Sequence, residues 1–182
     1  SPTVAECSFQ DIDGHWAREA ICEAAEQGIA AGESELTFAP DRPVTRLEFV
    51  VMLMEALRIE IGGEPPAMDF SDEESIPDEL RAALWTAVRE KLLDGYPDGT
   101  LRPRQPLTRT EAAVIVAKAM RWEVARVRST TYADDARIPA WAKAYVESAR
   151  QHGLLVGRGD NRFEPDGWLT RAEATAILLR LR

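Results

Sequence analysis

The residues in this chain best suited to chemistry are Arg46, Arg109 and Arg171, because each recurs in the same short motif, Thr-Arg-x-Glu. A guanidinium is a planar donor that can bind a carboxylate through two parallel hydrogen bonds. Each motif precedes an apolar stretch of helical period, so each arginine is expected in the first turn of a helix. The helix dipole disfavours a cation there. Its threefold recurrence therefore indicates a role other than helix formation.

The other two fixed residues of the motif predict how these helices begin. Threonine at the N-cap and glutamate three positions later can form a capping box, which satisfies two backbone donors that the helix leaves unpaired. The predicted capping residues are Thr45, Glu48, Thr108, Glu111, Thr170 and Glu173.

The motif marks a longer internal repeat. Its copies start 63 and 62 residues apart, and a glycine precedes each start by thirteen positions, at Gly32, Gly95 and Gly157. Upstream, an aromatic residue precedes an aspartate by two positions in each copy, the aspartates being Asp11, Asp72 and Asp134. Repeats of this kind decide the architecture. They divide the chain into copies at 9–60, 70–121 and 132–182, with linkers at 61–69 (containing Pro65 and Pro66) and 124–131.

Each copy is expected to hold two helices. Apolar residues at i, i+3, i+4 and i+7 predict the first helix over 16–27, 78–90 and 140–151. Pro77 and Pro139 fit its N1 position, and Asp13 can cap the first copy. The same helix is expected to end at Gly28, Lys91 and Gly153, where a positive φ is favoured.

The second helix of each copy begins at the motif and carries a matching apolar stripe. One copy of about 52 residues buries too little surface to be stable alone. Three equivalent stripes can be buried together in a central three-helix bundle with pseudo-threefold symmetry, while a linear solenoid is the alternative. Either arrangement is all-α.

At this level of detail the sequence resembles the S-layer homology (SLH) domain, in three tandem motifs. The first copy reads Phe-Gln-Asp at 9–11, His-Trp-Ala at 15–17 and Gly-Ile at 28–29. The second has Gly-Tyr-Pro-Asp-Gly-Thr-Leu-Arg-Pro at 95–103, and the third has Leu-Thr-Arg-Ala-Glu at 169–173. The resemblance covers nearly the whole chain.

The resemblance implies a non-catalytic, extracellular module that anchors surface proteins to the bacterial cell wall. Its fold would be a three-pronged spindle around a central three-helix bundle. Its partner would be secondary cell-wall polysaccharide, or a glycan linked to peptidoglycan, often with a terminal pyruvylated N-acetylmannosamine. Grooves between motifs would bind the glycan through Arg46, Arg109, Arg171, Gly32, Gly95, Gly157, Asp11, Asp72, Asp134, Trp16 and Trp141.

This implied ligand agrees with the chemistry of the arginines. A pyruvate ketal carries one carboxylate, and a helix N-terminus is expected to offer free N–H groups to an anion. The glycines would let backbone approach the ligand, and a tryptophan could pack on a sugar face. We expect Arg→Ala to lower affinity sharply and Arg→Lys to lower it less.

The copies also depart from the pattern. Gly99 in the second copy aligns with Leu36 and Asn161; a leucine is strained at positive φ, so the first loop is expected to take another shape. Glu79 aligns with Trp16 and Trp141, and a carboxylate would repel an anionic sugar. Only one or two grooves are therefore expected to bind well.

Several simpler roles stay open for these residues. Each arginine could form a surface ion pair with its own glutamate or an acidic neighbour. The three aspartates could bind loop backbone, and the two tryptophans could anchor the core. The runner-up function is a helical protein–protein adaptor or self-assembly module. A glycosidase is disfavoured because the repeated acids have a capping explanation.

Composition narrows the partners further. The net charge of −9 argues against nucleic acid and against an anionic membrane surface, and no run of about 18 apolar residues could span a membrane. His15 and His152 have no partner at metal-ligand spacing, so neither metal nor cofactor is predicted. Cys7 and Cys22 could form a disulfide or remain free thiols. The start at Ser1 fits a mature or trimmed product, and a cargo domain would lie outside this chain.

Overall fold

The computed structural model describes residues 7–63, 67–124, 126–155 and 157–182. Within them the chain forms six α-helices, α1 (Arg18–Glu26), α2 (Arg46–Ala56), α3 (Asp78–Arg89), α4 (Arg109–Ala119), α5 (Lys143–Gln151) and α6 (Arg171–Leu179). Short 3-10 helices lie at η1 (Glu73–Ser75), η2 (Asp135–Arg137) and η3 (Ala140–Ala142). The all-α class is confirmed for these residues. Residues 64–66 and 125 of the predicted linkers lie outside them.

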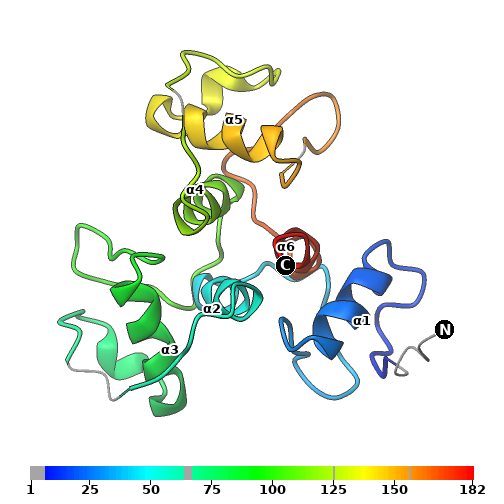
Figure 1. Cartoon of the computed structure of the whole chain (residues 1–182), viewed down its shortest axis with the longest axis vertical. Helices are drawn as coiled ribbons and strands as arrows, with labels where there is room; N and C mark the ends of the chain where they lie inside the picture. The colour runs from blue at the N-terminus through cyan, green and yellow to red at the C-terminus, as the bar shows by residue number, and fades with distance from the viewer. Residues whose placement is uncertain (1–6, 64–66, 125, 156) are drawn as a thin grey trace.

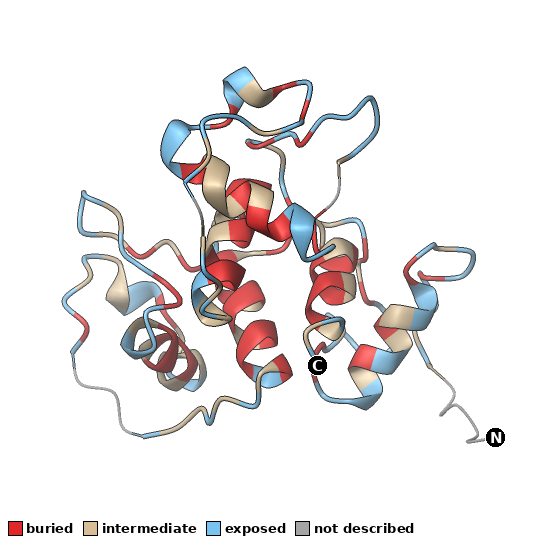
Figure 2. Cartoon of the chain, turned by 45° about the horizontal axis from the view of Figure 1, so that its top comes forward, coloured by how far each residue is buried: buried red, intermediate tan, exposed pale blue. Residues whose placement is uncertain are grey.

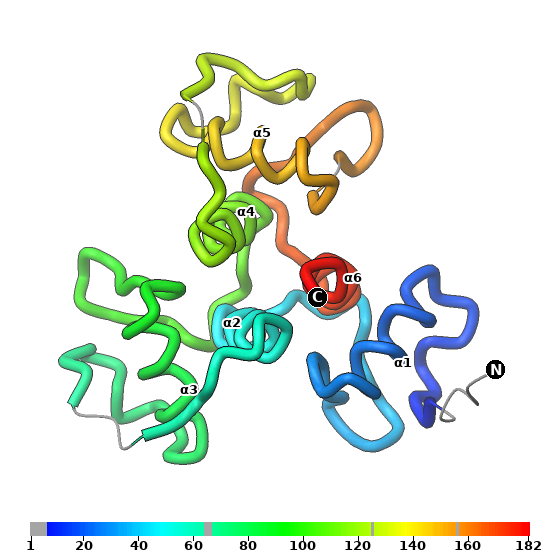
Figure 3. Tube along the Cα trace, viewed as in Figure 1, coloured from blue at the N-terminus to red at the C-terminus, as the bar shows by residue number. Residues whose placement is uncertain are grey.

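The helices fall into two groups (Figure 1). The motif helices α2, α4 and α6 lie around the centre of the molecule, and α1, α3 and α5 lie outside them. The trace in Figure 3 runs from an outer helix to a central one in each copy, and the C-terminus lies at the end of α6.

Each outer helix packs against the central helix of the preceding copy rather than that of its own. Thus α3 packs on α2, α5 on α4, and α1 on α6, while α2 and α6 also pack on each other. The contact between α1 and α6 joins the first copy to the last. Because every outer helix needs a neighbouring copy to cover its apolar face, a single copy cannot bury its own core.

A ring of backbone hydrogen bonds links the three segments that enter the central helices. Val44 N–H donates to Leu169 O at 2.8 Å, Leu169 N–H to Leu107 O at 2.9 Å, and Leu107 N–H to Val44 O at 3.0 Å. These bonds belong to three isolated antiparallel bridges between copies. The ring is closed, since each segment donates once and accepts once.

The central helices are buried on more than one face (Figure 2). The predicted apolar stripe of α2 is buried, at Phe49, Met52, Leu53 and Ala56, and so are Val50 and Met54 outside it. The same holds for Ala113 and Ala117 in α4. A helix that is apolar around most of its circumference is one that neighbours cover on several sides, and these helices face both the centre and an outer helix.

The ends of the outer helices follow the sequence with small corrections. Gly28, Lys91 and Gly153 adopt positive φ values of 74°, 59° and 67°, as predicted. The predicted cap at Asp13 is wrong: α1 begins later, with Ala17 at its N-cap and no side-chain cap bond, and Asp13 lies 3.9 Å from the guanidinium of Arg18. Pro77 occupies the N-cap of α3 rather than N1, because its ψ of 142° is extended.

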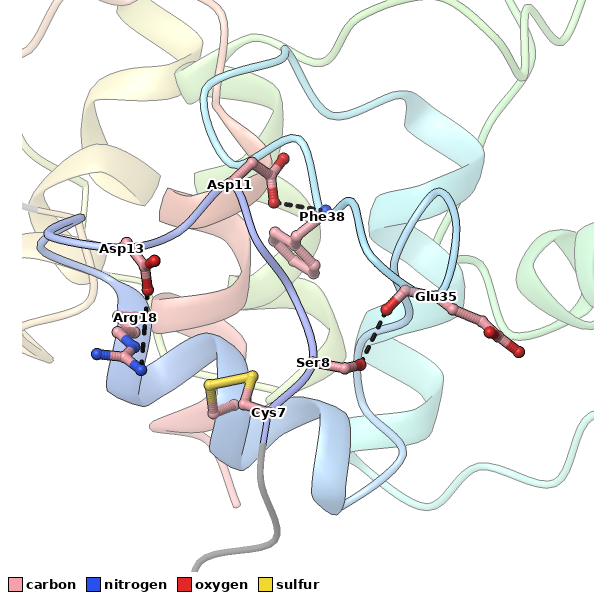
Figure 4. The surroundings of a disulfide bond; sticks show 8 residues. Cys7, Ser8, Asp11, Asp13, Arg18, Glu35 and Phe38 are labelled. Atoms are coloured by element: carbon pink, nitrogen blue, oxygen red, sulfur yellow. Dashed lines mark hydrogen bonds and ion pairs between the residues drawn. A yellow bond between two sulfur atoms is a disulfide. The ribbon is translucent and has the colours of Figure 1, made fainter.

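Cys7 and Cys22 form a disulfide (Figure 4). It ties the segment before the first helix to α1, with Cα atoms 5.5 Å apart and a sequence separation of 15. Closing a loop of this length contributes roughly 3 kcal/mol in the chain-entropy model. The first copy therefore carries a covalent link between its N-terminal segment and the helix that packs on α6.

Candidate functional site

The three motif arginines are buried, with only 6%, 1% and 5% of Arg46, Arg109 and Arg171 exposed. Each reaches into the next copy and pairs with the motif glutamate there. Arg46 Nη1 lies 2.7 Å from Glu111 and Arg109 Nη1 lies 3.0 Å from Glu173; Arg171 pairs with Glu48. The ion pairs therefore run between copies, not within one motif, and they too form a closed ring.

The same guanidiniums hold the loops of the next copy. Arg46 donates to the carbonyl of Asp94 at 2.9 Å, and Arg109 donates to that of Phe163 at 2.7 Å. Arg171 donates to the carbonyls of Phe38 and Ala31 at 3.0 and 2.7 Å. An aromatic ring lies beneath each guanidinium at 4.6 to 5.0 Å, in reach of a cation–π interaction.

The charge of these pairs is maintained despite burial. Burial lowers the pKa of Arg109, and nearby Arg158 lowers it further; an arginine still remains protonated in proteins. Burial opposes ionisation of Glu48, but the hydrogen bond from Arg42 and the charge of Arg171 outweigh it and hold the pKa of Glu48 below its ordinary value.

The motif threonines cap the central helices. In each, the hydroxyl accepts from the backbone N–H of the motif glutamate at 3.1 Å. Glu48 and Glu173 accept in return from the threonine N–H, which completes a capping box. Glu111 instead accepts from the hydroxyl of Thr108 at 3.0 Å.

The expectation of free N–H groups at these helix starts is wrong. The first two N–H groups of each central helix donate to carbonyls in the loop of the next copy. For α2 these are the bonds from Arg46 to Gln105 and from Leu47 to Pro103, both 2.9 Å. The loop carbonyls occupy the position where an anion was expected, so the helix start itself is closed.

The aspartates and glycines of the repeat shape the loops. Both carboxylate oxygens of Asp11, Asp72 and Asp134 accept loop N–H groups, at 2.8 to 2.9 Å. Burial opposes their ionisation, yet these backbone donors lower the pKa of each. A Cβ on Gly95 would meet the ring of Phe70, and one on Gly32 that of Phe9, so these glycines let the aromatic residue of their own copy approach.

The loops differ as the alignment predicts. Gly99 and Asn161 adopt φ values of 83° and 53°, whereas Leu36 is not among the described residues with positive φ. Trp16 and Trp141 are exposed at 67% and 64%, so neither anchors the core.

Three grooves of the same construction surround the central helices. Each is lined by the segment after an outer helix, by the central helix of the same copy, by the motif arginine of the preceding copy, and by the start of the outer helix of the following copy. We number each groove by the copy that supplies its central helix. Their cavities measure about 440, 220 and 310 Å³ for grooves 1, 2 and 3. Each groove therefore needs all three copies.

The charged residues that line the grooves differ in sign. Groove 2 has three basic and two acidic residues, the buried Arg46 with Lys91, Lys118, Asp94 and Glu111. Groove 3 also has three and two, Arg109, Arg158, Arg180, Asp41 and Glu173. Groove 1 has one basic and three acidic residues, Arg171, Glu33, Glu48 and Glu55.

The following copy contributes a different residue to each groove. Trp141 lines groove 2 and Trp16 lines groove 3. In groove 1 the contributing residue is Leu80, next to Glu79. Of the residues predicted from the sequence to bind glycan, the two tryptophans, the three arginines, Gly32 and Gly157 line these grooves. Lys91, Lys118, Arg158 and Arg180 also line them and were not predicted.

The described residues contain no group of three metal-ligating side chains. No helix among them is long and apolar enough to cross a membrane.

The closed rings of hydrogen bonds and ion pairs, with the grooves between copies, define an all-α module of three repeats. The S-layer homology domain model matches residues 8–50, 69–113 and 131–175, so the chain belongs to that family.

Relatives match most of the repeat array. The chain is 33% identical to an amylopullulanase of Thermoanaerobacterium thermosulfurigenes, over 96% of this chain and 9% of that protein. It is 26% identical to the surface-layer 125 kDa protein of Lysinibacillus sphaericus, over 94% and 14%. It is 27% identical to the cellulosome-anchoring protein of Acetivibrio thermocellus, over 79% and 33%. The chain spans about a third or less of each of these proteins.

The family assignment sets the general role. S-layer homology domains anchor surface proteins to the bacterial cell wall, so the chain is assigned to the cell surface and to anchoring rather than catalysis.

Proposed function

We propose that this chain binds secondary cell-wall polysaccharide through grooves 2 and 3, which take an acidic terminal sugar such as pyruvylated N-acetylmannosamine. The observation that carries the proposal is the combination, in these two grooves, of an exposed tryptophan with an excess of basic side chains. Groove 1 has neither feature.

The two features suit the two parts of such a ligand. An indole ring presents a large apolar face on which the C–H face of a sugar can pack, while its N–H remains able to donate a hydrogen bond. A carboxylate on the sugar would be attracted by Lys118 in groove 2 and by Arg180 in groove 3, which are both exposed. Exposed charges act weakly alone, so the tryptophan is expected to supply most of the affinity.

The motif arginines would act from the base of the grooves. Arg46 lines groove 2, and within the described part of the chain its protein acceptors take three of its five N–H donors. Its charge would favour an anion bound above it. The aspartates and glycines would contribute by shaping the loop that forms one wall.

The chain would serve as the anchoring part of a longer protein. This is supported by the relatives, of which it spans a third or less. Cargo domains would lie in the remaining length.

Co-sedimentation with purified bacterial walls tests the proposal, before and after the non-peptidoglycan polymer is chemically stripped. We expect the chain to pellet with intact walls and to stay in solution with stripped walls. Binding that survives stripping would assign peptidoglycan as the ligand. Failure to bind either preparation would favour the protein–protein adaptor.

A further inference from the structure

Trp141 contributes to two cavities, not one. Besides groove 2, it lines a separate cavity of about 540 Å³ together with Arg126, Val127 and Arg128 of the second linker. The remaining lining residues, Ala140 and Ala144, are small and lie on the same helical stretch as the tryptophan. We call this second space the linker cavity. Its position means that the indole of Trp141 borders both groove 2 and the linker.

The linker cavity is basic. Arg126 and Arg128 line it, and no carboxylate does so among the described residues. Both arginines are exposed, and within the described chain neither forms an ion pair or a side-chain hydrogen bond. The acid that contacts the end of this linker, Asp135, is already bound to Thr130 at 2.6 Å and to Lys143 at 2.7 Å. Two guanidiniums beside one aromatic ring are therefore available to an anion.

The first linker shows that this arrangement is not required by the fold. Residues 61–69 connect the first two copies in the same way, yet they contain no lysine or arginine and include Glu64 and Asp69. The outer helix that follows them has Glu79 where Trp141 stands in the third copy. The basic residues and the tryptophan thus occur together at one junction and are both replaced by acids at the other.

We propose that the linker cavity is a second glycan subsite, which binds a further anionic sugar residue of the strand whose terminal sugar occupies groove 2. This inference rests on the proposed function. The guanidinium offers two parallel donors to a carboxylate or phosphate, and the shared indole allows consecutive sugars to contact one ring system. The ligand class is an acidic oligosaccharide rather than a single sugar.

The test compares two probes on one variant. The probes are the methyl glycoside of pyruvylated N-acetylmannosamine and the oligosaccharide fragments released from a secondary cell-wall polymer that ends in this sugar. With groove 3 weakened by W16A in every protein compared, we expect R126Q/R128Q to lower the affinity of groove 2 for the fragments about tenfold, as suits the loss of two exposed charge contacts. Affinity for the single sugar should stay at the value of the W16A protein, because groove 2 is untouched.

A charge-matched control is the R104Q/R137Q variant. Arg104 and Arg137 are exposed and line none of the grooves described above. The control removes the same net charge and should bind both probes like the W16A protein. An equal loss in control and variant would overturn the subsite in favour of long-range charge.

The remaining outcomes separate this inference from the proposed function. Binding of both probes by the W16A protein, with unchanged binding when R126Q/R128Q is added, overturns the subsite alone. A loss for the single sugar as large as that for the fragments assigns the two arginines to groove 2 and also overturns it. If wild-type protein binds neither probe, the proposed function fails and the subsite with it.

Discussion

Groove 1 and grooves 2 and 3 have the same base and different exposed edges. At the base of each, a buried arginine from the preceding copy pairs with the motif glutamate of the central helix. At the edge, groove 1 carries acids and a leucine, whereas each of the other two carries a tryptophan and two basic residues beside one exposed aspartate. Groove 1 also has a larger cavity than either. The volume of its cavity therefore does not set groove 1 apart. The charge and type of its lining side chains do.

The three grooves differ most clearly in charge at one position of the repeat. Glu55, Lys118 and Arg180 follow the repeat glycines at the same distance and line grooves 1, 2 and 3. All three are exposed, so the fold tolerates either charge. The arginine–glutamate pairs, in contrast, hold loops and helices together in every copy. The motif therefore stabilises the fold in every copy, whereas the exposed positions around it would determine which groove suits an anion.

The largest effect should come from the buried arginine–glutamate pairs that all three grooves share, and it should be an effect on stability. Replacing Arg109 with alanine leaves the part-buried Glu173 with Arg158 as its remaining cationic partner and removes the donor to the Phe163 carbonyl, so we expect a loss of about 3 kcal/mol in the free energy of unfolding. R171A should lose a similar amount although its groove is acidic. Urea unfolding followed by circular dichroism measures both.

R104A is the control for these variants, since surface changes of this kind stay within about 0.5 kcal/mol. Wild-type stability in R171A would show that the buried arginine–glutamate pairs of the three grooves are not equivalent. Because the arginines stabilise the fold, a loss of glycan affinity in an Arg→Ala variant counts as a binding effect only where the variant is shown to be folded.

The next largest effect should come from the tryptophans. W141A is expected to weaken groove 2 by about 2 kcal/mol, roughly thirtyfold, because a buried aromatic contact of this kind dominates a small interface. W16A should do the same to groove 3, and the double variant should abolish binding. L80A removes the side chain that the following copy contributes to groove 1. It should leave the affinity for a pyruvylated sugar, measured by titration calorimetry, unchanged. A loss in L80A as large as that in W141A would end the distinction between the grooves.

A smaller effect is expected from reversing one charge at the shared position. K118E should lower the affinity of groove 2 about tenfold, since an attraction becomes a repulsion that solvent and salt partly screen. E55K makes the opposite change in groove 1 and should not alter binding in grooves 2 and 3. Were E55K to strengthen binding as much as K118E weakens it, the net charge of the protein would be responsible, not the groove. Measurements at two salt concentrations separate these outcomes.

The sequence predicted what depends on local spacing. The period of the apolar residues gave the helices, and the threonines and glutamates of the motif lie at the starts of α2, α4 and α6, where their spacing places them. The exposed Lys118 and Arg180 could also have been found, because the repeat register aligns them with Glu55 and a change of charge at one position is visible without a structure.

The ion pairs and the closed helix starts could not be predicted in this way. Arg46 pairs with Glu111 rather than with Glu48 of its own motif. The spacing of residues within one copy does not indicate which neighbouring copy supplies the partner of its arginine. The carbonyl of Gln105 that binds the N–H of Arg46 likewise comes from the next copy. Both depend on the order of copies around the centre, which is a property of the packing.

The smallest effect should be a gain. In a W16A/W141A background, adding E79W and E55K supplies groove 1 with the tryptophan and base that the other grooves have. We expect weak binding to appear, at least about tenfold weaker than in groove 2, because Glu33 still lines groove 1 and its ion-pair partner Arg42 is shared with Glu48, so the two carboxylates together still repel an anion. Adding E33Q should then strengthen it, and E33Q alone should not create binding. Titration calorimetry with the pyruvylated sugar decides the matter. No gain in the combined variant would mean that the exposed edge is insufficient, and that the different loop shape around Leu36 also separates groove 1 from the other two.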